Sequence, residues 1–225
     1  TQLVPLAATL AVLGDKADDL AVKDKLIQWY WCGVFGELYA SATETRFGKD
    51  FPELLEWIAN GEEPSTVKEA TFNSQRLDTL RTRNSAAYKG VYALLMRDGA
   101  EDFRTGQPAT EMAYFDEKID IHHIFPQDWC AKQGIPRDRY NSVINKTPLT
   151  ATTNRKISNK APSIYLTGLQ GNQVTEARMD EILRTHVIDV EAMRADDFNR
   201  FYAARKAGLL KRIEQAMKKP IVTTE

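Results

Sequence analysis

Two adjacent histidines, His122 and His123, are the residues of this chain best suited to acid–base or metal chemistry. They lie in the stretch IDIHHIFPQDW, and the 225-residue chain has one other histidine, His186. A neutral imidazole accepts a proton near physiological pH and also binds divalent metals. Neighbouring residues of a strand point to opposite faces, so both histidines can face one site only where the strand ends or bulges. Pro126 favours such an end.

Three asparagines that could take part in acid–base or metal chemistry follow the histidines in the sequence. Asn145 falls in a β-prone run, and Asn154 and Asn159 fall in the segment TNRKISNK. Amide groups both ligate metals and hydrogen-bond to backbone. The plainer interpretation of the histidines alone is a pair hydrogen-bonded at a strand terminus. The phosphate-loop, dinucleotide-turn, nucleophile-elbow and zinc-helix motifs are all missing from the sequence, so other catalytic chemistry has little support.

A strand, a loop, a second strand and a helix are predicted around these residues. The first β-prone run covers 118–123 and the second covers 142–149. The segment TATTNRKISNK predicts a short helix with Thr150 or Thr152 as its N-cap, and Pro162 is placed to open the next helix.

The remainder of the sequence predicts helices. Apolar residues at helical spacing indicate three helical regions: 20–39, 85–97 and 174–219. Residues 41–61 are expected to form two short helices separated at Pro52, followed by a loop over 62–71. We therefore expect a mainly α fold, a helical domain with an embedded strand–strand–helix unit.

Aromatic residues crowd the first long helix. Ile27 and Trp31 are expected on its buried face. The run Trp29, Tyr30 and Trp31 is either part of a core or a platform on which bases stack, and core is the interpretation we adopt.

Taken together, these segments resemble the HNH, or His-Me finger, nucleases, which are built on the ββα-metal motif. The first strand ends in IDIHHIFPQ, the second carries INKTPLT and the helix carries TNRKISNK. More narrowly, HHIFP, NKTPL and NRKISNKAPSIYL are similar to the C-terminal nuclease domain of GmrSD-type modification-dependent restriction enzymes and related phage-defence proteins. The motif covers Asp120–Leu166, and the flanking WYWCGVFGELY resembles the same family more loosely.

The resemblance implies a role for each polar residue. His123 would be the general base, with its far ring nitrogen held by a backbone acceptor. His122 and Asn154 would bind the metal, and Asn145 on the second strand would brace the loop that orients His123. Asn159 is an alternative to Asn154, although it also suits helix capping.

The implied cofactor is one divalent metal, with Mg²⁺ expected. Many relatives carry Asp or Glu at the position of His122, and a neutral ligand also suits Mn²⁺, Ni²⁺ or Zn²⁺. Asp120, two residues earlier on the same strand face, is a candidate partner for His122.

Local clusters of positive charge indicate where DNA would bind, because the net charge of the chain is −1. Residues 137–160 contain six basic residues against one acidic, and residues 200–219 contain seven against one. Three basic side chains and a neighbouring asparagine flank the proposed site and are expected to contact DNA: Arg155, Lys156, Lys160 and Asn159. A solvated basic turn is the alternative. Tyr165 either stacks on the substrate or packs in the core.

The expected organisation has three parts: a helical subdomain over 1–100, an HNH core over 101–170 and C-terminal helices over 171–225. We expect the chain to be part of a longer protein and to start inside a helix. The resemblance implies that an N-terminal nucleotide-hydrolysing domain, absent from this chain, precedes it and acts as its partner. No window is apolar enough to cross a membrane, and two cysteines, Cys32 and Cys130, fit a bacterial cytoplasm.

The expected function is that of a metal-dependent DNA endonuclease, cutting one or both strands, as the effector half of a restriction or phage-defence system. The alternative is an inactive, nuclease-derived module that binds DNA or docks a partner. A metal-dependent phosphatase or peptidase would need more carboxylate or histidine ligands than the motif offers.

Overall fold

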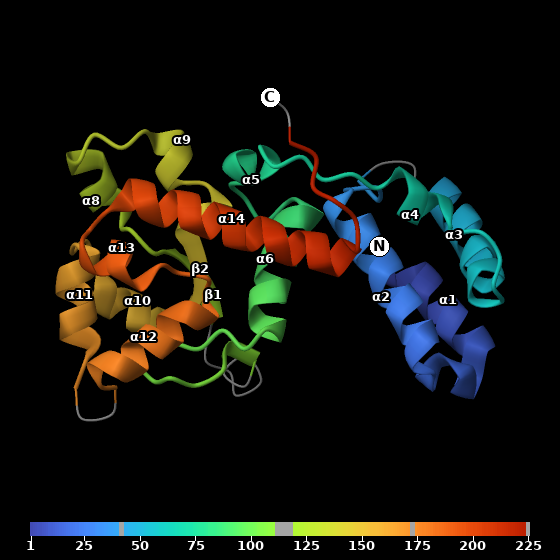
Figure 1. The fold of residues 1–225 in the computed structure, drawn as a ribbon, viewed down its shortest axis with the longest axis horizontal. Coiled ribbons are helices and arrows are strands. Elements are labelled where there is room, and N and C mark those ends of the chain that lie inside the picture. The colour runs from blue at the N-terminus through green and yellow to red at the C-terminus, as the bar shows by residue number, and fades with distance from the viewer. Residues whose placement is uncertain (41–42, 111–118, 172–173, 224–225) are drawn as a thin grey trace. The chain divides into compact units, whose positions relative to one another are not determined.

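The computed structural model describes residues 1–40, 43–110, 119–171 and 174–223, and within them the fold is mainly helical, as predicted (Figure 1). Contacts divide the chain into two compact units. The first unit contains Thr1–Ser74, Arg83–Gly90 and Arg212–Glu225, and the second contains Gln75–Thr82 and Val91–Lys211. Each unit thus combines segments far apart in the sequence, whereas the three expected parts were continuous.

The first unit is built from α1 to α4 and a short 3₁₀ helix, η1. Their bounds are α1 Leu3–Leu13, η1 Gly14–Asp18, α2 Leu20–Phe35, α3 Thr43–Ile58 and α4 Ser65–Glu69. The core interpretation of the aromatic run is confirmed for Trp29, which is fully buried, and Trp31, which stacks on Phe35 with ring centroids 5.6 Å apart. Ile27 was expected to be buried, but it is 47% exposed, because α2 turns the side of Leu26 and Trp29 inward.

Two predictions for the first unit are wrong. Pro52 lies inside the single helix α3 and does not separate two helices. Proline removes one helical hydrogen bond, but the buried side chains of Leu54 and Trp57 follow on the same helix and keep it continuous by packing. The expected loop over 62–71 contains α4, whose Thr66 and Val67 are buried.

The second unit surrounds a two-stranded antiparallel sheet, β1 Ile119–His123 and β2 Lys146–Thr150. Between the strands lie α8 Gln127–Lys132, α9 Arg137–Tyr140 and the 3₁₀ helix η2 Val143–Asn145. After β2 come α10 Ala151–Ile157, α11 Pro162–Leu169, α12 Glu176–Thr185, α13 Val190–Arg194 and α14 Phe198–Met217. The short α5 Arg76–Thr79 belongs to this unit, α6 Ala86–Arg97 begins in the first unit, and α14 ends there.

The order strand, strand, helix follows the sequence prediction closely. β1 ends at His123 as expected, and the part of the predicted strand before residue 119 lies outside the described residues. β2 is shorter than predicted, because residues 143–145 wind into η2, and Asn145 therefore precedes the strand. Thr150 caps α10 by accepting a hydrogen bond from the Thr153 backbone N–H, and α10 contacts both strands. Pro162 opens α11, as predicted.

An aromatic cluster anchors the segment that follows β1. The Phe125 ring lies 4.8 Å from Phe201 and 5.4 Å from Phe198, measured between centroids, and both partners belong to α14. Tyr165 is buried and its hydroxyl donates to the Ile124 carbonyl at 2.9 Å, so it packs in the core. Burial of such rings contributes on the order of 2 kcal/mol each, which fixes the backbone directly after the two histidines.

Candidate functional site

His123, the last residue of β1, is held by side chains from the segment between the strands. Its Nε2 atom lies 3.1 Å from Oδ1 of Asn141, which directly follows α9. The amide nitrogen of Gln127, the first residue of α8, lies 3.3 Å from both ring nitrogens. Because an amide oxygen only accepts hydrogen bonds, Nε2 carries the hydrogen and Nδ1 keeps its lone pair. The expected backbone acceptor is thus replaced by the Asn141 side chain.

The surroundings of His123 keep its imidazole neutral. The pKa of His123 is lowered to about 4, mainly by burial; the hydrogen bond to Asn141 opposes this decrease, and electrostatic interactions with Lys146 and His122 add to it. An imidazole with this pKa is almost entirely unprotonated at neutral pH. His123 can therefore accept a proton without first having to lose one.

His122 lies opposite Thr147 in the strand register, whereas His123 lies opposite Lys146. The two histidine side chains therefore leave the sheet on opposite faces, as anticipated for neighbours within a strand. Nε2 of His122 is buried. A site shared by both side chains must lie at the end of β1, where His123 is the terminal residue. The side chain of Asp120, the proposed partner of His122, lies outside the described part.

Asn145 joins the two segments that surround His123. Its side chain accepts from the Phe125 backbone N–H and donates to the Phe125 carbonyl, both at 2.9 Å. It also donates to the Tyr140 carbonyl at 2.9 Å. Asn145 is completely buried, so these bonds replace all contact with water. One amide thus fixes the turn after β1 and the end of α9, next to Asn141.

The proposed DNA-binding residues lie on and after α10, and the side chains of Arg155, Lys156 and Lys160 are exposed. Asn159 donates to the Asp128 carboxylate at 2.6 Å. Asn159 therefore bonds to α8 rather than capping a helix, and the turn after α10 lies next to the start of α8, where Gln127 contacts His123.

Asn154, the proposed metal ligand, also lies on α10. Its side chain is partly buried and makes no hydrogen bond to the residues that the structure describes. The amide is therefore available for a ligand.

A buried carboxylate, Asp102, fixes the junction between β2 and α10. It accepts from the backbone and hydroxyl of Thr150, each at 3.0 Å, and from the Thr153 hydroxyl at 2.7 Å. Burial raises the pKa of Asp102, but these hydrogen bonds outweigh it and hold the pKa below its ordinary value. Asp102 also accepts from the Arg104 and Thr105 backbone N–H groups, each at 3.1 Å. The sequence did not reveal its bonds to Thr150 and Thr153, because these residues lie about fifty positions away.

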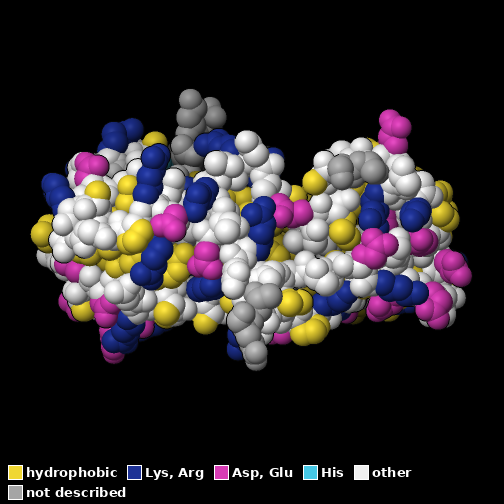
Figure 2. All heavy atoms as spheres, turned by 90° about the horizontal axis from the view of Figure 1, so that it is seen from above, with side chains coloured by type: hydrophobic (Ala, Val, Ile, Leu, Met, Phe, Trp, Pro, Cys, Tyr) yellow, Lys and Arg dark blue, Asp and Glu magenta, His cyan; other side chains and the backbone are white. Residues whose placement is uncertain are grey.

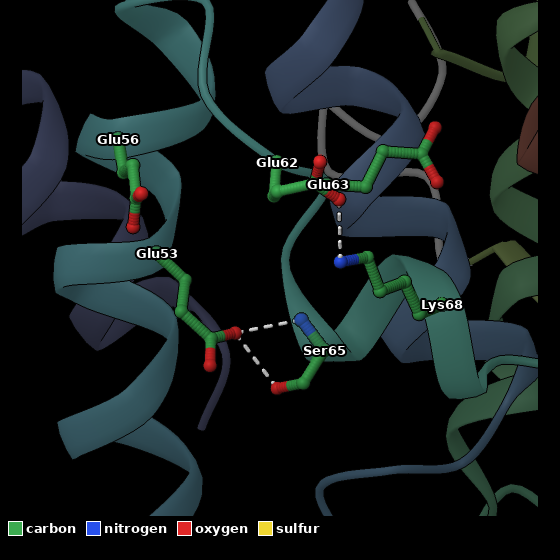
Figure 3. Close-up of a pocket in the computed structure, with 6 residues that line it drawn as sticks. All are labelled: Glu53, Glu56, Glu62, Glu63, Ser65 and Lys68. Carbon is green, nitrogen blue, oxygen red and sulfur yellow. Dashed lines mark hydrogen bonds and ion pairs between the residues drawn. The ribbon is translucent and has the colours of Figure 1, made fainter.

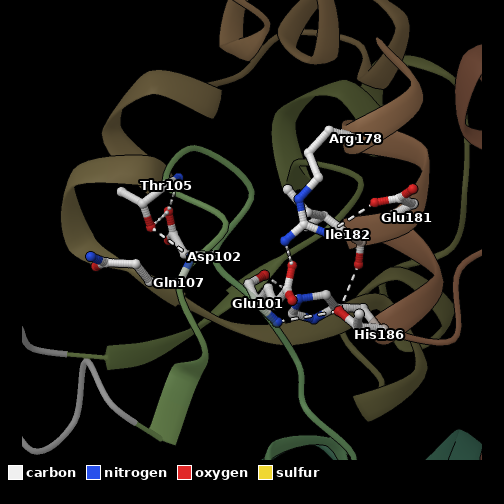
Figure 4. A network of polar contacts seen from close by, with 9 residues as sticks. Glu101, Asp102, Thr105, Gln107, Arg178, Glu181, Ile182 and His186 are labelled. Atoms are coloured by element: carbon white, nitrogen blue, oxygen red, sulfur yellow. Dashed lines mark hydrogen bonds and ion pairs between the residues drawn. The ribbon is translucent and has the colours of Figure 1, made fainter. Parts of the chain in front are cut away.

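His186 has a structural role. Its Nδ1 lies 2.6 Å from the Thr147 hydroxyl, and its Nε2 lies 2.6 Å from the Glu101 carbonyl (Figure 4). Both ring nitrogens are thus used, and burial lowers the pKa of His186 to about 4. Figure 4 also shows Arg178 reaching toward Glu101 and Glu181, with both of which it forms ion pairs. His186 links α12 to β2 and does not contribute a catalytic ring.

Arg205 was counted in a basic helix face and is instead completely buried. Its guanidinium donates to the backbone carbonyls of Ile144, Lys146 and His186 and to the Thr147 hydroxyl. These bonds hold η2 and the start of β2 in place. The charge of Arg205 is therefore used in the interior and is not available to DNA.

Charge on the surface is mixed. Figure 2 shows Lys and Arg side chains among Asp and Glu over the displayed face. A hollow of about 210 Å³ in the first unit is lined by Glu53, Glu56, Glu62, Glu63, Ser65 and Lys68 (Figure 3). Glu53 accepts from Ser65, and Glu62 pairs with Lys68. Such an acidic lining repels a polyanion, so this hollow is not a candidate for binding DNA.

Among the described residues, no three His, Cys, Asp or Glu side chains are arranged so that they could hold a metal ion. The predicted metal ligands are His122 and Asn154, and only His122 belongs to these four residue types. In the same part of the chain no helix is both long and apolar enough to cross a membrane.

Comparison with known proteins finds one relative that is similar in sequence. An uncharacterized protein of the archaeon Methanocaldococcus jannaschii is 32% identical over an alignment of 222 residues, and the match covers 87% of this chain. The chain spans 37% of the length of that relative. No family model and no solved structure matches.

Proposed function

We propose that this chain is a metal-dependent DNA endonuclease of the HNH type, acting as the cutting part of a modification-dependent restriction or phage-defence protein. The observation that carries the proposal is His123, a neutral imidazole at the end of the first strand of a strand–strand–helix unit. Its Nε2 is held by Asn141, and the surrounding turn is braced by Asn145. The family resemblance of the sequence agrees with this arrangement.

His123 would act through Nδ1. Nδ1 takes a proton from a water molecule, and the resulting hydroxide attacks the phosphorus while the bond to the 3′ oxygen breaks. The hydrogen bond from Nε2 to Asn141 keeps the ring in the required tautomer and stabilises the imidazolium once it forms. The products are a 5′-phosphate and, after protonation of the leaving oxygen, a 3′-hydroxyl.

Gln127 affects this step, because its amide nitrogen lies 3.3 Å from Nδ1, the atom that would accept the proton. A donor at this distance competes with water for the lone pair. The amide contacts both ring nitrogens without a close bond to either, so a water molecule can take the position at Nδ1 after a small rotation of the Gln127 side chain.

The residues that would hold a metal are His122 and Asn154. One imidazole and one amide oxygen, together with water, fit a divalent cation, and the absence of a carboxylate from this pair favours Mn²⁺ or Ni²⁺ more than in relatives with an acidic residue. When bound, the cation supplies positive charge to the phosphate oxygens as the transition state forms. Mg²⁺ is the expected physiological ion.

Exposed basic residues would place the DNA. Arg155, Lys156 and Lys160 follow the metal-ligand candidate along α10 and its C-terminal turn, where cations contact phosphates without reading sequence. Binding should therefore weaken steeply with salt and depend little on base sequence.

Cleavage of supercoiled plasmid tests the proposal. The purified chain is incubated with Mg²⁺, Mn²⁺ or Ni²⁺, and nicked and linear products are measured over time. His123→Ala is expected to slow cleavage by about 100-fold or more, and Asn154→Ala by a similar factor. Asn199→Ala changes an exposed helical asparagine of the same unit and serves as the matched control, with cleavage expected at the wild-type rate.

Two outcomes would refute the proposal in different ways. If His123→Ala cuts as fast as the wild-type chain, His123 is not the base. If the wild-type chain binds DNA but leaves plasmid intact with each of the three metals, the chain is a nuclease-derived binding module, the alternative function.

A further inference from the structure

Two basic residues outside the four predicted DNA contacts, Lys146 and Arg81, are connected at the start of β2, opposite His123. Lys146 is the partner of His123 in the strand register, and its Nζ donates to the Arg81 backbone carbonyl at 2.8 Å. The neighbouring Leu80 carbonyl accepts from the Val143 N–H at 2.7 Å. These two hydrogen bonds attach residues 80–81 to the start of β2, at the same end of the sheet as His123.

The charges in this arrangement have the same sign. Burial lowers the pKa of Lys146 to about 8, and the positive charge of Arg81 contributes to the decrease. Lys146 in turn acts on His123. Among the residues that the structure describes, Arg81 forms no ion pair, and its side chain is exposed. Like charges held together in this way repel each other, and a bound anion would relieve the repulsion.

Arginine suits a phosphate oxygen pair better than lysine does, because its planar guanidinium donates two parallel hydrogen bonds. Arg81 is exposed and attached through its own carbonyl, so its side chain is available to a ligand. Lys146 is nearly buried, with 6% of its surface exposed. The two residues therefore differ in role: Lys146 fixes the segment and adds positive potential, and Arg81 faces the solvent.

We propose that Arg81, fixed beside His123 by the Lys146 hydrogen bond, binds a phosphate of the DNA backbone next to the scissile one. The inference rests on the proposed nuclease function and adds a second contact to the basic residues of α10. Arg81 is attached at the start of β2, and α10 begins at its end.

Direct DNA binding tests this inference without cleavage. A short fluorescein-labelled duplex is titrated with the full chain in EDTA, and the affinity is measured by anisotropy over a series of NaCl concentrations. Arg81→Gln is expected to weaken binding about tenfold at low salt and to reduce the slope of log K against log salt by about one. Arg184→Gln removes an equal charge from an exposed position on α12 and should change neither quantity beyond a small long-range effect.

A second variant examines the attachment. Lys146→Met keeps the length of the side chain but loses the bond to the Arg81 carbonyl, and it should weaken binding in the same direction. Circular dichroism and thermal melting establish that each variant is folded before its affinity is interpreted. In cleavage reactions Arg81→Gln should raise KM about tenfold with kcat nearly unchanged, because Arg81 does not touch the reacting atoms.

The results separate this inference from the function on which it rests. If Arg81→Gln binds DNA with wild-type affinity and salt slope, the Arg81 inference is overturned, whether or not His123→Ala abolishes cleavage. If the wild-type chain binds the duplex and Arg81→Gln binds it more weakly, while plasmid stays uncut with every metal, the phosphate contact is supported and the nuclease proposal fails.

Discussion

Asn145→Ala should destabilise the second unit more than any exposed substitution near the site. The side chain makes three hydrogen bonds of 2.9 Å, to Phe125 N–H, Phe125 C=O and Tyr140 C=O, and it has no exposed surface. Removing the amide takes a hydrogen bond from three backbone groups, of which the Phe125 carbonyl keeps a weak one from the Cys130 thiol at 3.6 Å. A buried unsatisfied group costs about 1–3 kcal/mol. We expect the free energy of unfolding to fall by about 3–5 kcal/mol, a large part of the typical 5–15 kcal/mol.

Urea unfolding followed by circular dichroism measures this change, and hydrogen exchange at the Phe125 amide locates it. Asn159→Ala is the matched control, because its side chain is exposed and makes one hydrogen bond to Asp128; a change below about 1 kcal/mol is expected. A loss of less than about 1 kcal/mol for Asn145→Ala, with unchanged exchange at Phe125, would show that the amide does not hold this turn.

Three further changes test other parts of the structure. The pKa of His186 is about 4 in the folded chain and about 6.5 in the unfolded chain, so the unfolded chain binds a proton first as pH falls. The free energy of unfolding should therefore drop by up to about 3 kcal/mol between pH 6.5 and 4. Urea titrations of His186→Gln should lack that part of the pH dependence. Gly208→Ala would place a methyl group 2.2 Å from Cγ1 of Val187. This overpacking should cost about 1–3 kcal/mol of stability and lower the melting temperature. The control Gly48→Ala, whose methyl group meets no atom within 4 Å, should raise the melting temperature. If the proposed metal site is correct, His122→Asp should increase plasmid cleavage with Mg²⁺ relative to Ni²⁺, and an unchanged metal preference would argue against His122 as a ligand.

The elements around the site were predictable because their signals are local. Alternating β-prone residues before His123, a threonine N-cap at Thr150 and a proline at the start of α11 each act within a few positions of the chain. Pro52 and Ile27 were misassigned for the opposite reason. Whether a helix continues through a proline, and which of its faces is buried, depends on tertiary packing that a single sequence does not display.

The side chains that set the properties of the site could not be found in this way. Asn141 and Gln127 contact His123 from the residue after α9 and the first residue of α8, two short helices that the sequence did not predict. Arg205 belonged to a basic stretch that was interpreted as a solvated helix face. Asp102 accepts hydrogen bonds from residues about fifty positions along the chain. Such contacts arise when distant segments meet, so only three-dimensional coordinates reveal them. The metal ligands and the DNA contacts remain predictions.

The position of Asn145 explains how an amide that never reaches a substrate can govern the proposed base. Its bond to the Tyr140 carbonyl fixes the residue immediately before Asn141, and Asn141 in turn holds Nε2 of His123. Its two bonds to Phe125 fix the backbone two residues after His123. His123 is therefore constrained from both sides by one buried side chain. A shift in either segment would alter both the tautomer and the direction of Nδ1. If the proposed nuclease function is correct, loss of Asn145 should therefore reduce DNA cleavage even under conditions in which the chain stays folded.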